Sequence, residues 1–569
     1  MKNTVENTKK YVADFETREL DDEQIKAGEQ TYVWAWALCN CYNINNVPDG
    51  TSIRTFMKKL EQLNSGSYVY FHNLKFDGNF IINYLIKKGF KEVSRLKDLV
   101  SYSYTALVDG MGTWYSITIK FKRKRIFIYD SLKKLPFSVA KLAKDLGYKE
   151  GKGSIDYWKH REEDGELSDE DRDYIRRDVQ IVARALKEVC FDQGLTGITI
   201  GSDCMRIFKE QFCPKFNELF PKLSKEVDEF CRKAYKGGVC WVNKKFQGKM
   251  LGNGRTYDNN SEHPASQHSP NPMPYGEPVY FTGEYEKIPF YPLFIQHFKA
   301  AFTAKEGYMP TVQIKDNICY RDTEYVEEVL EPVELYMTNT DLEIFIEHYD
   351  IHYFEPIDGY AFKSAVGIFD KYIDYWYEKK AEATLKGDKV LRLLSKLMLN
   401  NLGGRFALSP NATKQSFRLE NGILRHNYIT DEKETVYCPV SVFMTSRSRK
   451  TLIDAVQANY DRCCYTDTDS LHLLGNEEAK GIEIHSTKLG AWKLESTWTA
   501  AKFLRQKTYA EFIDGKWEIK GCGMNDEVKA NIKDINDFKI NAEFSGKKTS
   551  KQVKGGIVLR ETTFKILPI

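Results

Sequence analysis

Short apolar segments separated by polar ones recur through the first 195 residues. Five of them are rich in β-branched and aromatic residues, which predicts strands: YVADFET (11–17), TYVWAWALC (31–39), SYVYFH (67–72), WYSITIKF (114–121) and KRIFIYD (124–130). Helical periodicity in SVAKLAKDLGY (138–148) and in residues 169–193 predicts amphipathic helices. This order of elements predicts a mixed α/β domain that ends near residue 195.

The pattern changes after that point. A polar, turn-rich piece is expected at 250–275, followed by a mixed region to about 365 and a helical pair around 366–403. A hairpin is expected at 407–437, and a β-rich stretch carries Asp467. A chain of 569 residues is too long for one core, so several domains are expected.

Composition narrows the class of protein. No run of ~18 apolar residues is present to cross a bilayer, and the N-terminal MKNTVENTKK lacks the apolar core of a signal peptide. The twelve cysteines show neither zinc spacing nor a pattern suited to a set of disulfides, which indicates reduced core residues in a cytosolic protein. A net charge of +3 does not indicate nucleic acid by itself, so any DNA-binding surface must come from local clusters.

Acidic residues in the N-terminal third have the spacing of a metal site. Asp14 and Glu16 lie two apart on a predicted strand and therefore share a face. Asp77 follows an apolar strand, and Asp178 lies four residues after Tyr174 on a predicted helix, so these two also share a face. Four acids on three elements could hold two metal ions for phosphodiester hydrolysis, with Tyr174 orienting the attacking water. Acids two apart are common in a chain with 80 Asp and Glu, so it is the full set that favours this site.

A second set of acids lies in the C-terminal two-thirds. The segment DRCCYTDTDSLHLL predicts a β-hairpin with Asp467 and Asp469 at its turn, and apolar flanks that favour a metal site over a solvated turn. Asp258 is the candidate partner, and two ions held by Asp258 and Asp469 could activate a primer hydroxyl and neutralise a triphosphate. Lys396 and Asn400 lie four apart on the following helix, although taken alone Lys396 is more often an ordinary exposed lysine.

These motifs, in this order, resemble those of the protein-primed family-B DNA polymerases of small tailed phages, the phi-twenty-nine-like group. The resemblance covers nearly the whole chain and includes the strings DFET, FHNLKFDG, YDSLKKLPF, YKGG, PYGEP, KLMLN, DTDS and LRQKTY. It implies a mixed α/β and α+β multidomain fold: a ribonuclease-H-like 3′→5′ exonuclease domain, then a right-hand polymerase of palm, fingers and thumb with two family-specific insertions.

The resemblance also implies domain boundaries. They are exonuclease 1–195, first part of the palm 196–270, insertion one 271–365, fingers 366–405, insertion two 406–437, second part of the palm 438–525 and thumb 526–569. Insertion one is expected to contact a terminal protein that primes synthesis. Insertion two is expected to encircle the template and to support strand displacement and processivity.

Functional residues follow from the matching motifs. The exonuclease metal ligands would be Asp14, Glu16, Asp77 and Asp178, assisted by Tyr174 and Lys152, and the polymerase carboxylates would be Asp258, Asp467 and Asp469. Residues expected to contact the single-stranded 3′ end are His72, Asn73, Phe76, Ser131, Leu132 and Phe137. Tyr235, Gly237 and Gly238 would contact the template, and Lys507 and Tyr509 the primer terminus. The incoming nucleotide would meet His263, Lys380, Lys396, Asn400 and the position of Gly403.

Two motifs depart from the family pattern. The family's D-x-x-S-L-Y-P is DNNSEHP here, so Glu262 and His263 replace Leu and Tyr, the Tyr normally lying under the nucleotide sugar and excluding ribose. Gly403 stands where a Tyr normally packs on the new base pair. A carboxylate beside a triphosphate adds like-charge repulsion, and Gly403 removes a stacking ring, which predicts a damaged nucleotide pocket.

Three functions remain open on this basis. The first is a DNA polymerase with proofreading that replicates a phage genome from a protein primer with strand displacement. The second is a metal-dependent 3′→5′ DNA exonuclease with an impaired polymerase pocket. The third, a non-catalytic DNA-binding protein, is disfavoured because acids stand at every metal position.

The first function implies a set of cofactors and partners. These are two Mg²⁺ ions per active site, with Mn²⁺ as a substitute, together with primer-template and single-stranded DNA, dNTPs and a terminal protein. A monomer without a membrane partner is expected, in the cytoplasm of the infected bacterial host.

Overall fold

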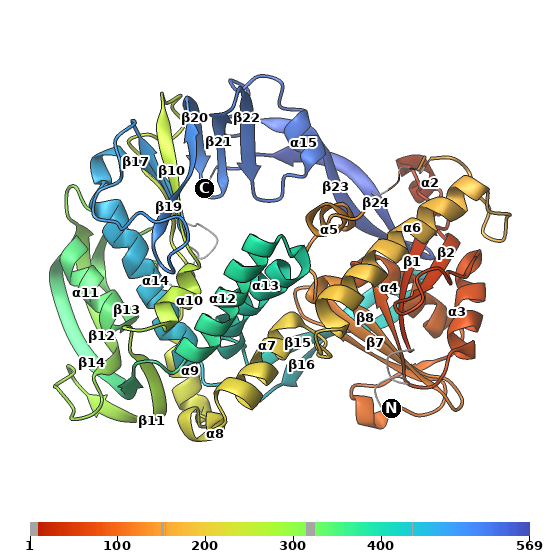
Figure 1. Ribbon diagram of the computed structural model, residues 1–569, viewed down its shortest axis with the longest axis horizontal. Coiled ribbons are helices and arrows are strands. Elements are labelled where there is room, and N and C mark those ends of the chain that lie inside the picture. The colour runs from red at the N-terminus through yellow and green to blue at the C-terminus, as the bar shows by residue number, and fades with distance from the viewer. Residues whose placement is uncertain are drawn as a thin grey trace.

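A computed structural model describes residues 9–149, 153, 155–156, 158–313, 325–434 and 436–568 (Figure 1). Its N-terminal part is built on an eight-stranded sheet of order β3-β2-β1-β4-β8-β7-β6-β5. The strands are β1 (Lys10–Thr17), β2 (Val33–Asn40), β3 (Asp49–Gly50), β4 (Ser67–Phe71), β5 (Lys91–Glu92), β6 (Ser103–Val108), β7 (Trp114–Lys120) and β8 (Arg125–Asp130). Strand β1 is antiparallel to β2 and parallel to β4, so the predicted mixed α/β domain is confirmed.

Helices cover this sheet. They are α3 (Ser52–Gln62), α4 (Leu74–Lys87), α5 (Val139–Leu146) and α6 (Asp169–Ala185), which continues as a π-helical segment over Leu186–Phe191. The short helix α2 (Asp22–Lys26) buries none of its residues, and its Ile25 packs beside Val553 and Val558 near the C-terminus. Helix α6 packs against β1 and β2. It begins where the sequence predicts because the Ser168 hydroxyl accepts from the Asp171 amide, and Asp171 accepts in return from the Ser168 backbone.

A second, central sheet has the order β19-β10-β18-β17-β9. Its strands are β9 (Cys240–Val242), β10 (Gly254–Asn259), β17 (Cys463–Asp467), β18 (Ser470–Leu474) and β19 (Trp492–Trp498). Helices α7 (Ile200–Ile207), α8 (Phe216–Leu219) and α9 (Lys225–Ala234) lead into it, and α14 (Pro439–Gln457) packs against β18 and α10 (Glu262–Gln267). The prediction of a turn-rich piece at 250–275 is therefore wrong in part, because β10 and α10 occupy much of it.

The segments between β10 and α14 follow the predicted order. A four-stranded sheet, called the insertion sheet below, has the order β11-β14-β12-β13 and consists of β11 (Met273–Thr282), β12 (Leu293–Ala304), β13 (Glu328–Thr338) and β14 (Tyr349–Ala365), with α11 (Asn339–His348) against it. The helical pair is α12 (Asp370–Lys386) and α13 (Lys389–Phe406), and the hairpin is β15 (Asn411–Glu420) with β16 (Ile423–Glu432). The predicted helical pair and hairpin are confirmed.

The C-terminal strands reach from the central sheet back to the N-terminal sheet (Figure 1). They are β20 (Ala500–Arg505), β21 (Thr508–Ile513), β22 (Lys516–Gly521), β23 (Glu543–Val553) and β24 (Gly556–Lys565), with α15 (Asp526–Ala530) between them. At the tip of the β23–β24 hairpin, the Gly555 amide donates to the Gly422 carbonyl at 3.2 Å and the Thr31 amide donates to the Lys554 carbonyl at 3.0 Å. The tip thus contacts both the β15–β16 hairpin and the N-terminal domain.

One hydrophobic core joins the N-terminal domain to the helical pair. Ile175 of α6, Phe208 after α7, Met398 of α13 and Val440 of α14 belong to the same buried cluster. Every cysteine among the described residues is free, and all of them except Cys522 are buried, which agrees with the prediction of reduced core residues. In the described part of the chain, no helix combines the length and the apolar character that a membrane crossing needs.

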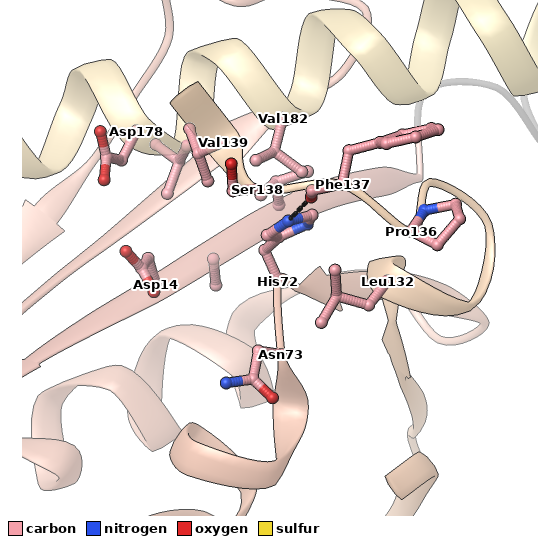
Figure 2. Close-up of a pocket in the computed structure, with 13 residues that line it drawn as sticks. Asp14, His72, Asn73, Leu132, Pro136, Phe137, Ser138, Val139, Asp178 and Val182 are labelled. Atoms are coloured by element: carbon pink, nitrogen blue, oxygen red, sulfur yellow. Dashed lines mark hydrogen bonds between the residues drawn. The ribbon is translucent and has the colours of Figure 1, made fainter. Parts of the chain in front are cut away.

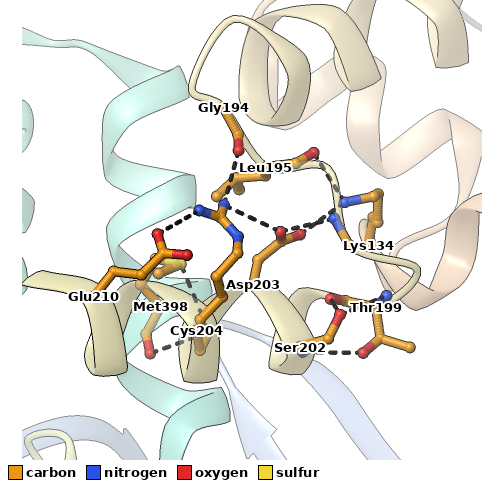
Figure 3. A network of polar contacts seen from close by, with 11 residues as sticks. Lys134, Gly194, Leu195, Thr199, Ser202, Asp203, Cys204, Glu210 and Met398 are labelled. Carbon is orange, nitrogen blue, oxygen red and sulfur yellow. Dashed lines mark hydrogen bonds and ion pairs between the residues drawn. The ribbon is translucent and has the colours of Figure 1, made fainter. Parts of the chain in front are cut away.

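A buried ion pair fixes the connection between the N-terminal domain and α7 (Figure 3). The Lys134 ammonium lies 2.8 Å from the Asp203 carboxylate, and both side chains are fully buried. Lys134 also donates to the Leu195 carbonyl at 3.1 Å, and the Gly197 amide donates to Asp203 at 2.8 Å. Each charge thus has several partners, which a buried pair needs if its desolvation is to be offset.

We expect Lys134→Met to destabilise the fold by about 3–5 kcal/mol, because it leaves the Asp203 carboxylate buried without its main counter-charge. The matched control is Lys187→Met, which removes a lysine whose pair with Asp192 is about one-third exposed and should cost less than about 1 kcal/mol. Calorimetric midpoints of the two variants measure the difference. Equal melting midpoints would show that the buried pair contributes no more to stability than the exposed pair.

Candidate active sites

The first acidic centre lies where three elements of the N-terminal domain meet. Asp14 and Glu16 are on β1, Asp77 is on the first turn of α4, and Asp178 is on α6. Glu16, Asp77 and Asp178 are buried, each less than 7 % exposed. Tyr174, one turn before Asp178 on α6, is buried as well. The structure therefore places these residues on the elements that the sequence predicts, and Tyr174 and Asp178 on one face of α6.

The electrostatics of Asp77 favour a bound cation. Burial raises the pKa of Asp77 well above its ordinary value, and the neighbouring Asp14 and Glu16 carboxylates raise it further. The Asp77 Oδ1 atom is buried and has no hydrogen-bond partner among the described residues. Carboxylate oxygens that are short of donors suit a hard divalent cation such as Mg²⁺.

A cavity of about 560 Å³ opens beside this centre (Figure 2). Asp14 and Asp178 line it together with four of the residues expected to contact a 3′ end: His72, Asn73, Leu132 and Phe137. The His72 ring is held at both nitrogens, Nδ1 at 2.8 Å from the Ser131 hydroxyl and Nε2 at 2.7 Å from the Phe137 carbonyl oxygen. The cavity thus has a fixed wall beside the carboxylates.

Two other predicted residues of this site, Ser131 and Phe76, do not line the cavity. Ser131 is fully buried and donates to the Phe71 carbonyl, so it supports His72 and does not line the cavity. Phe76 packs against Phe80 with ring centroids 5.8 Å apart. Lys152 lies outside the described residues.

Asp130 belongs to the support of this cavity, and the sequence did not single it out. Its carboxylate accepts from the Asn73 amide at 3.1 Å and from the Leu132 amide at 3.0 Å, and it is only 2 % exposed. Asn73 needs this support because its φ of 78° lies in the left-handed region, which Asn tolerates better than most residues.

The second centre is set by strand register in the central sheet. Ser470 of β18 is paired with Asp258 of β10 on one side and with Asp467 of β17 on the other. Asp469 precedes Ser470 in the two-residue turn, and its carbonyl accepts from the Asn259 amide at 2.7 Å. The predicted hairpin is confirmed, and Asp258 lies beside it although it is some 200 residues away in the sequence.

Lysines compensate part of the charge at this centre. Lys507 lies 2.6 Å from Asp467, and Lys493 lies 3.3 Å from Asp258. Burial raises the pKa of Asp469 to about 6, and Asp258 and Asp467 add to the effect. Burial and the two neighbouring carboxylates therefore act together to disfavour the ionised form of Asp469.

A cavity of about 460 Å³ separates these carboxylates from a basic wall. Lys380 of α12 and Lys396 and Asn400 of α13 line it, as predicted, and so does Arg392. Arg392, Lys396 and Asn400 recur every four residues on the exposed face of α13, so helical spacing could have identified Arg392. Lys493, which also lines the cavity, follows a long irregular segment and has no comparable signal in the sequence.

The departures from the family motifs are accommodated by α14. His263 lines the cavity, and its Nδ1 atom lies 2.9 Å from the Ser448 hydroxyl. Gly403 is buried and does not line the cavity; a Cβ atom added there would stand 2.5 Å from Met444 Sδ. The Met444 side chain therefore fills the space beside Gly403, and the missing ring leaves no hole there.

The YKGG segment packs against the acidic turn. A Cβ atom at Gly238 would stand 2.8 Å from Thr468 Cγ2, so this position requires glycine, whereas Gly237 has open space around it. The Arg449 guanidinium donates to the carbonyls of Lys236 and Gly237 at 2.7 and 3.1 Å. It also pairs with Asp341 of α11 at 2.7 Å, which joins this segment to the insertion sheet.

The last two predicted residues flank the centre from the C-terminal strands. Lys507 pairs with Asp467, and its amide donates to the Tyr465 hydroxyl at 3.0 Å. Tyr509 packs against Tyr465 with ring centroids 4.8 Å apart, and burial raises its pKa. Within the described ranges, no three His, Cys, Asp or Glu side chains are arranged so that together they could hold a metal ion.

Comparison with known proteins places the chain in a family. Residues 59–172 and 158–487 match the family model described as DNA polymerase type B, organellar and viral. The DNA polymerase of Bacillus phage Nf is 41 % identical over 98 % of this chain and 99 % of its own length, and that of Bacillus phage phi29 is 40 % identical over the same shares. The DNA polymerase of Streptococcus phage Cp-1 is 35 % identical over 98 % of both chains.

Solved structures give the same result. The structure of phi29 DNA polymerase complexed with primer-template DNA and incoming nucleotides has a TM-score of 0.90, 39 % identity, and coverage of 98 % of this chain and 100 % of its own. The phi29 enzyme complexed with single-stranded DNA has a TM-score of 0.89 and 38 % identity over 98 % of this chain and 100 % of its own. The predicted multidomain fold is confirmed. The chain belongs to the organellar and viral type B DNA polymerases and is a DNA-directed DNA polymerase, a nucleotidyltransferase, of the phi29 type.

Proposed function

We propose that this polymerase replicates a phage genome from a protein primer, proofreads its product with a 3′→5′ exonuclease, and displaces the non-template strand. The observation that carries the proposal is the presence of two separate acidic centres, each beside its own cavity. The phi29 structures named above contain primer-template DNA, nucleotides or single-stranded DNA, and we infer the same ligands for this chain.

The proposed division of labour follows the sequence boundaries. Residues 1–195 would form the exonuclease, 196–270 and 438–525 the palm, 366–405 the fingers and 526–569 the thumb. The insertion sheet, within 271–365, would hold the terminal protein. The β15–β16 hairpin, within 406–437, would encircle the template and support strand displacement, and its contact with the tip of β23–β24 is consistent with that role.

At the first centre, the residues present fit a hydrolytic site. Asp14, Glu16, Asp77 and Asp178 would hold two divalent ions, Mg²⁺ or Mn²⁺, which supply an activated water and stabilise the leaving oxygen. The cavity wall of His72, Asn73, Leu132 and Phe137 would hold the unpaired 3′ end against the carboxylates. Tyr174 would orient the water, and Lys152 would assist.

At the second centre, the carboxylates face the basic wall across the cavity. Asp258 and Asp469, with Asp467, would hold divalent ions that lower the negative charge of the triphosphate and the pKa of the primer hydroxyl. Lys380, Arg392 and Lys396 would neutralise the phosphates from the other side. Lys507 and Tyr509 would position the primer terminus, and Tyr235, Gly237 and Gly238 the template.

The remaining partners complete the proposal. From the family membership we infer that the enzyme works as a monomer in the cytoplasm of an infected bacterium and uses a terminal protein as its primer. The alternative, an exonuclease with an impaired polymerase pocket, is favoured only by the buried Glu262 carboxyl in the nucleotide cavity. Gly403 does not favour it, because Met444 fills the adjacent space.

The two centres should be separable by mutation. We expect Asp14→Ala with Asp77→Ala to lower 3′-end degradation by more than about 100-fold while primer extension persists. The loss of two ligands should exceed the effect of disturbing the support of one ligand, which is about 10- to 100-fold. Asp469→Asn should instead lower primer extension while 3′-end degradation persists. A 5′-labelled recessed primer incubated in Mg²⁺ with and without dNTPs measures both activities on one gel.

The unmutated chain provides the reference lanes. It should lengthen the primer with dNTPs and shorten it without them. Shortening in both lanes would favour the alternative of an impaired polymerase pocket. Mg²⁺-dependent degradation that persists in the Asp14 and Asp77 double variant would show that the first centre is wrongly assigned.

The packing of Gly403 generates a separate prediction. We expect Gly403→Tyr to lower the melting midpoint by an amount that corresponds to about 1–3 kcal/mol, because the added ring overlaps Met444. Adding Met444→Ala should restore part of the loss, and Met444→Ala alone should be destabilising. Additive effects of the two substitutions would contradict a shared space for the two side chains.

A further inference from the structure

A row of buried polar side chains lies directly behind the acids of the second centre. The acids belong to a row of residues paired across three strands, called the acidic row: Asp258, Ser470 and Asp467. Two residues away along the same strands is a second row: Thr256, His472 and Tyr465. Side chains two residues apart on a strand point to the same face, so the two rows share one face of the central sheet. Each residue of the second row is at most 6 % exposed.

Strand β21 and the residue before it cover both rows. Lys507 pairs with Asp467 of the acidic row, and Tyr509 packs against Tyr465 of the second row. Glu511, two residues further along, reaches the middle of the second row, where its Oε1 atom lies 2.7 Å from His472 Nδ1. The Glu511 and His472 side chains are only 7 % and 1 % exposed. A buried carboxylate and a buried imidazole therefore meet behind the acidic row.

Hydrogen bonds continue from this pair to the acidic turn. An ionised carboxylate only accepts, so the Glu511 carboxylate makes Nδ1 of His472 the donor and thereby orients the ring. The other ring nitrogen, Nε2, then lies 3.2 Å from the Ser470 hydroxyl, and that hydroxyl donates to the Asp467 carbonyl at 3.2 Å. The Thr256 hydroxyl donates to Glu511 Oε1 at 2.8 Å and holds the carboxylate from the other side. A chain of contacts thus runs from Glu511 through His472 and Ser470 to the main chain of Asp467.

The end of this chain is where the geometry of the acids is set. Ser470 is paired with Asp258 on one strand and with Asp467 on another, and it directly follows Asp469. A shift of Ser470 would therefore change the spacing of all three carboxylates. Neither Glu511 nor His472 lines the nucleotide cavity, so any effect of this pair on the reaction passes through Ser470.

We propose that Glu511 and His472 are positioning residues for nucleotidyl transfer, which hold Ser470 and thereby the carboxylate spacing at which divalent ions bind. The proposal rests on the proposed function, since it takes Asp258, Asp467 and Asp469 as the metal ligands. Loss of the pair should raise the demand for metal ion and lower the rate. The affinity for nucleotide should change little, because the basic wall of the cavity is not involved.

The kinetic test uses two substitutions of Glu511. We would measure kcat, KM for dATP and the Mg²⁺ concentration for half-maximal rate in single-nucleotide incorporation, per titrated active site. Glu511→Leu should raise the half-maximal Mg²⁺ concentration by about tenfold or more, the usual effect of losing the support of a metal ligand. KM for dATP at saturating Mg²⁺ should stay within about twofold. Glu511→Gln keeps an acceptor for Nδ1 and should recover most of the loss.

The matched control separates positioning from stability. Glu518 of β22 is paired with Glu511 in the neighbouring strand and is partly exposed, so Glu518→Leu should leave the Mg²⁺ dependence unchanged. Glu511→Leu with a lowered melting midpoint but the unmutated kcat and Mg²⁺ dependence would overturn the proposal. The effects of Glu511→Leu and His472→Leu on Mg²⁺ demand should not add, because both break one chain of contacts. Additive effects would contradict that chain.

Metal binding gives a readout without catalysis. Mn²⁺ binding to the complex of enzyme and primer-template, followed by electron paramagnetic resonance, would be compared in a chain that already carries Asp14→Ala and Asp77→Ala. Adding Glu511→Leu should weaken Mn²⁺ binding by about tenfold, and equal affinities would overturn the proposal. If Glu511→Leu does not fold, Ser470→Ala decides: it removes only the last hydroxyl of the chain and should weaken Mn²⁺ binding likewise, and an unchanged affinity would sink the proposal.

An error in the assignment of the acids would look different. In that case Asp469→Asn would extend the primer as well as the unmutated chain does. If Asp469→Asn loses extension while Glu511→Leu keeps the unmutated kcat and Mg²⁺ dependence, the assignment of the second centre stands and the positioning role of Glu511 and His472 is wrong.

Discussion

The structure depends on holding carboxylates together after they have lost their water. Each acidic centre gathers groups that repel one another, and burial makes the repulsion stronger because the local dielectric is low. Asp77 at the first centre and Asp469 at the second have raised pKa values for this reason. Main-chain geometry holds these repelling groups in place. At the first centre, strand β1 carries both Asp14 and Glu16. At the second, Ser470 of β18 is paired with Asp258 on one neighbouring strand and with Asp467 on the other.

Helix α14 supports the second cavity from behind. Met444 lies one turn before the adjacent residues Ser448 and Arg449. The three contact Gly403, His263 and the Lys236–Gly237 backbone respectively. Two of these contacts meet positions where this chain departs from the phage polymerase motifs. His263 and Gly403 are therefore packed against α14, and the space beside Gly403 is filled by Met444.

Much of this arrangement could be predicted from local sequence, and the limits have physical causes. Spacing along a single strand or helix predicted which side chains share a face. These pairs are Asp14 with Glu16, Tyr174 with Asp178, and Lys396 with Asn400. The prediction for residues 250–275 was partly wrong because Asn259, Glu262 and Gln267 are polar residues that lie buried, so hydrophobicity does not mark β10 and α10. Lys493 and Met444 reach the second centre only through tertiary packing, which no periodicity along the chain reports.

Arg449 links the insertion sheet to the acidic turn. Its guanidinium grips Asp341 beside the insertion sheet and the carbonyls of Lys236 and Gly237, and the next residue, Gly238, presses on Thr468 between Asp467 and Asp469. A displacement of the insertion sheet would therefore be passed to the acidic turn through Arg449 and the Lys236–Gly238 segment.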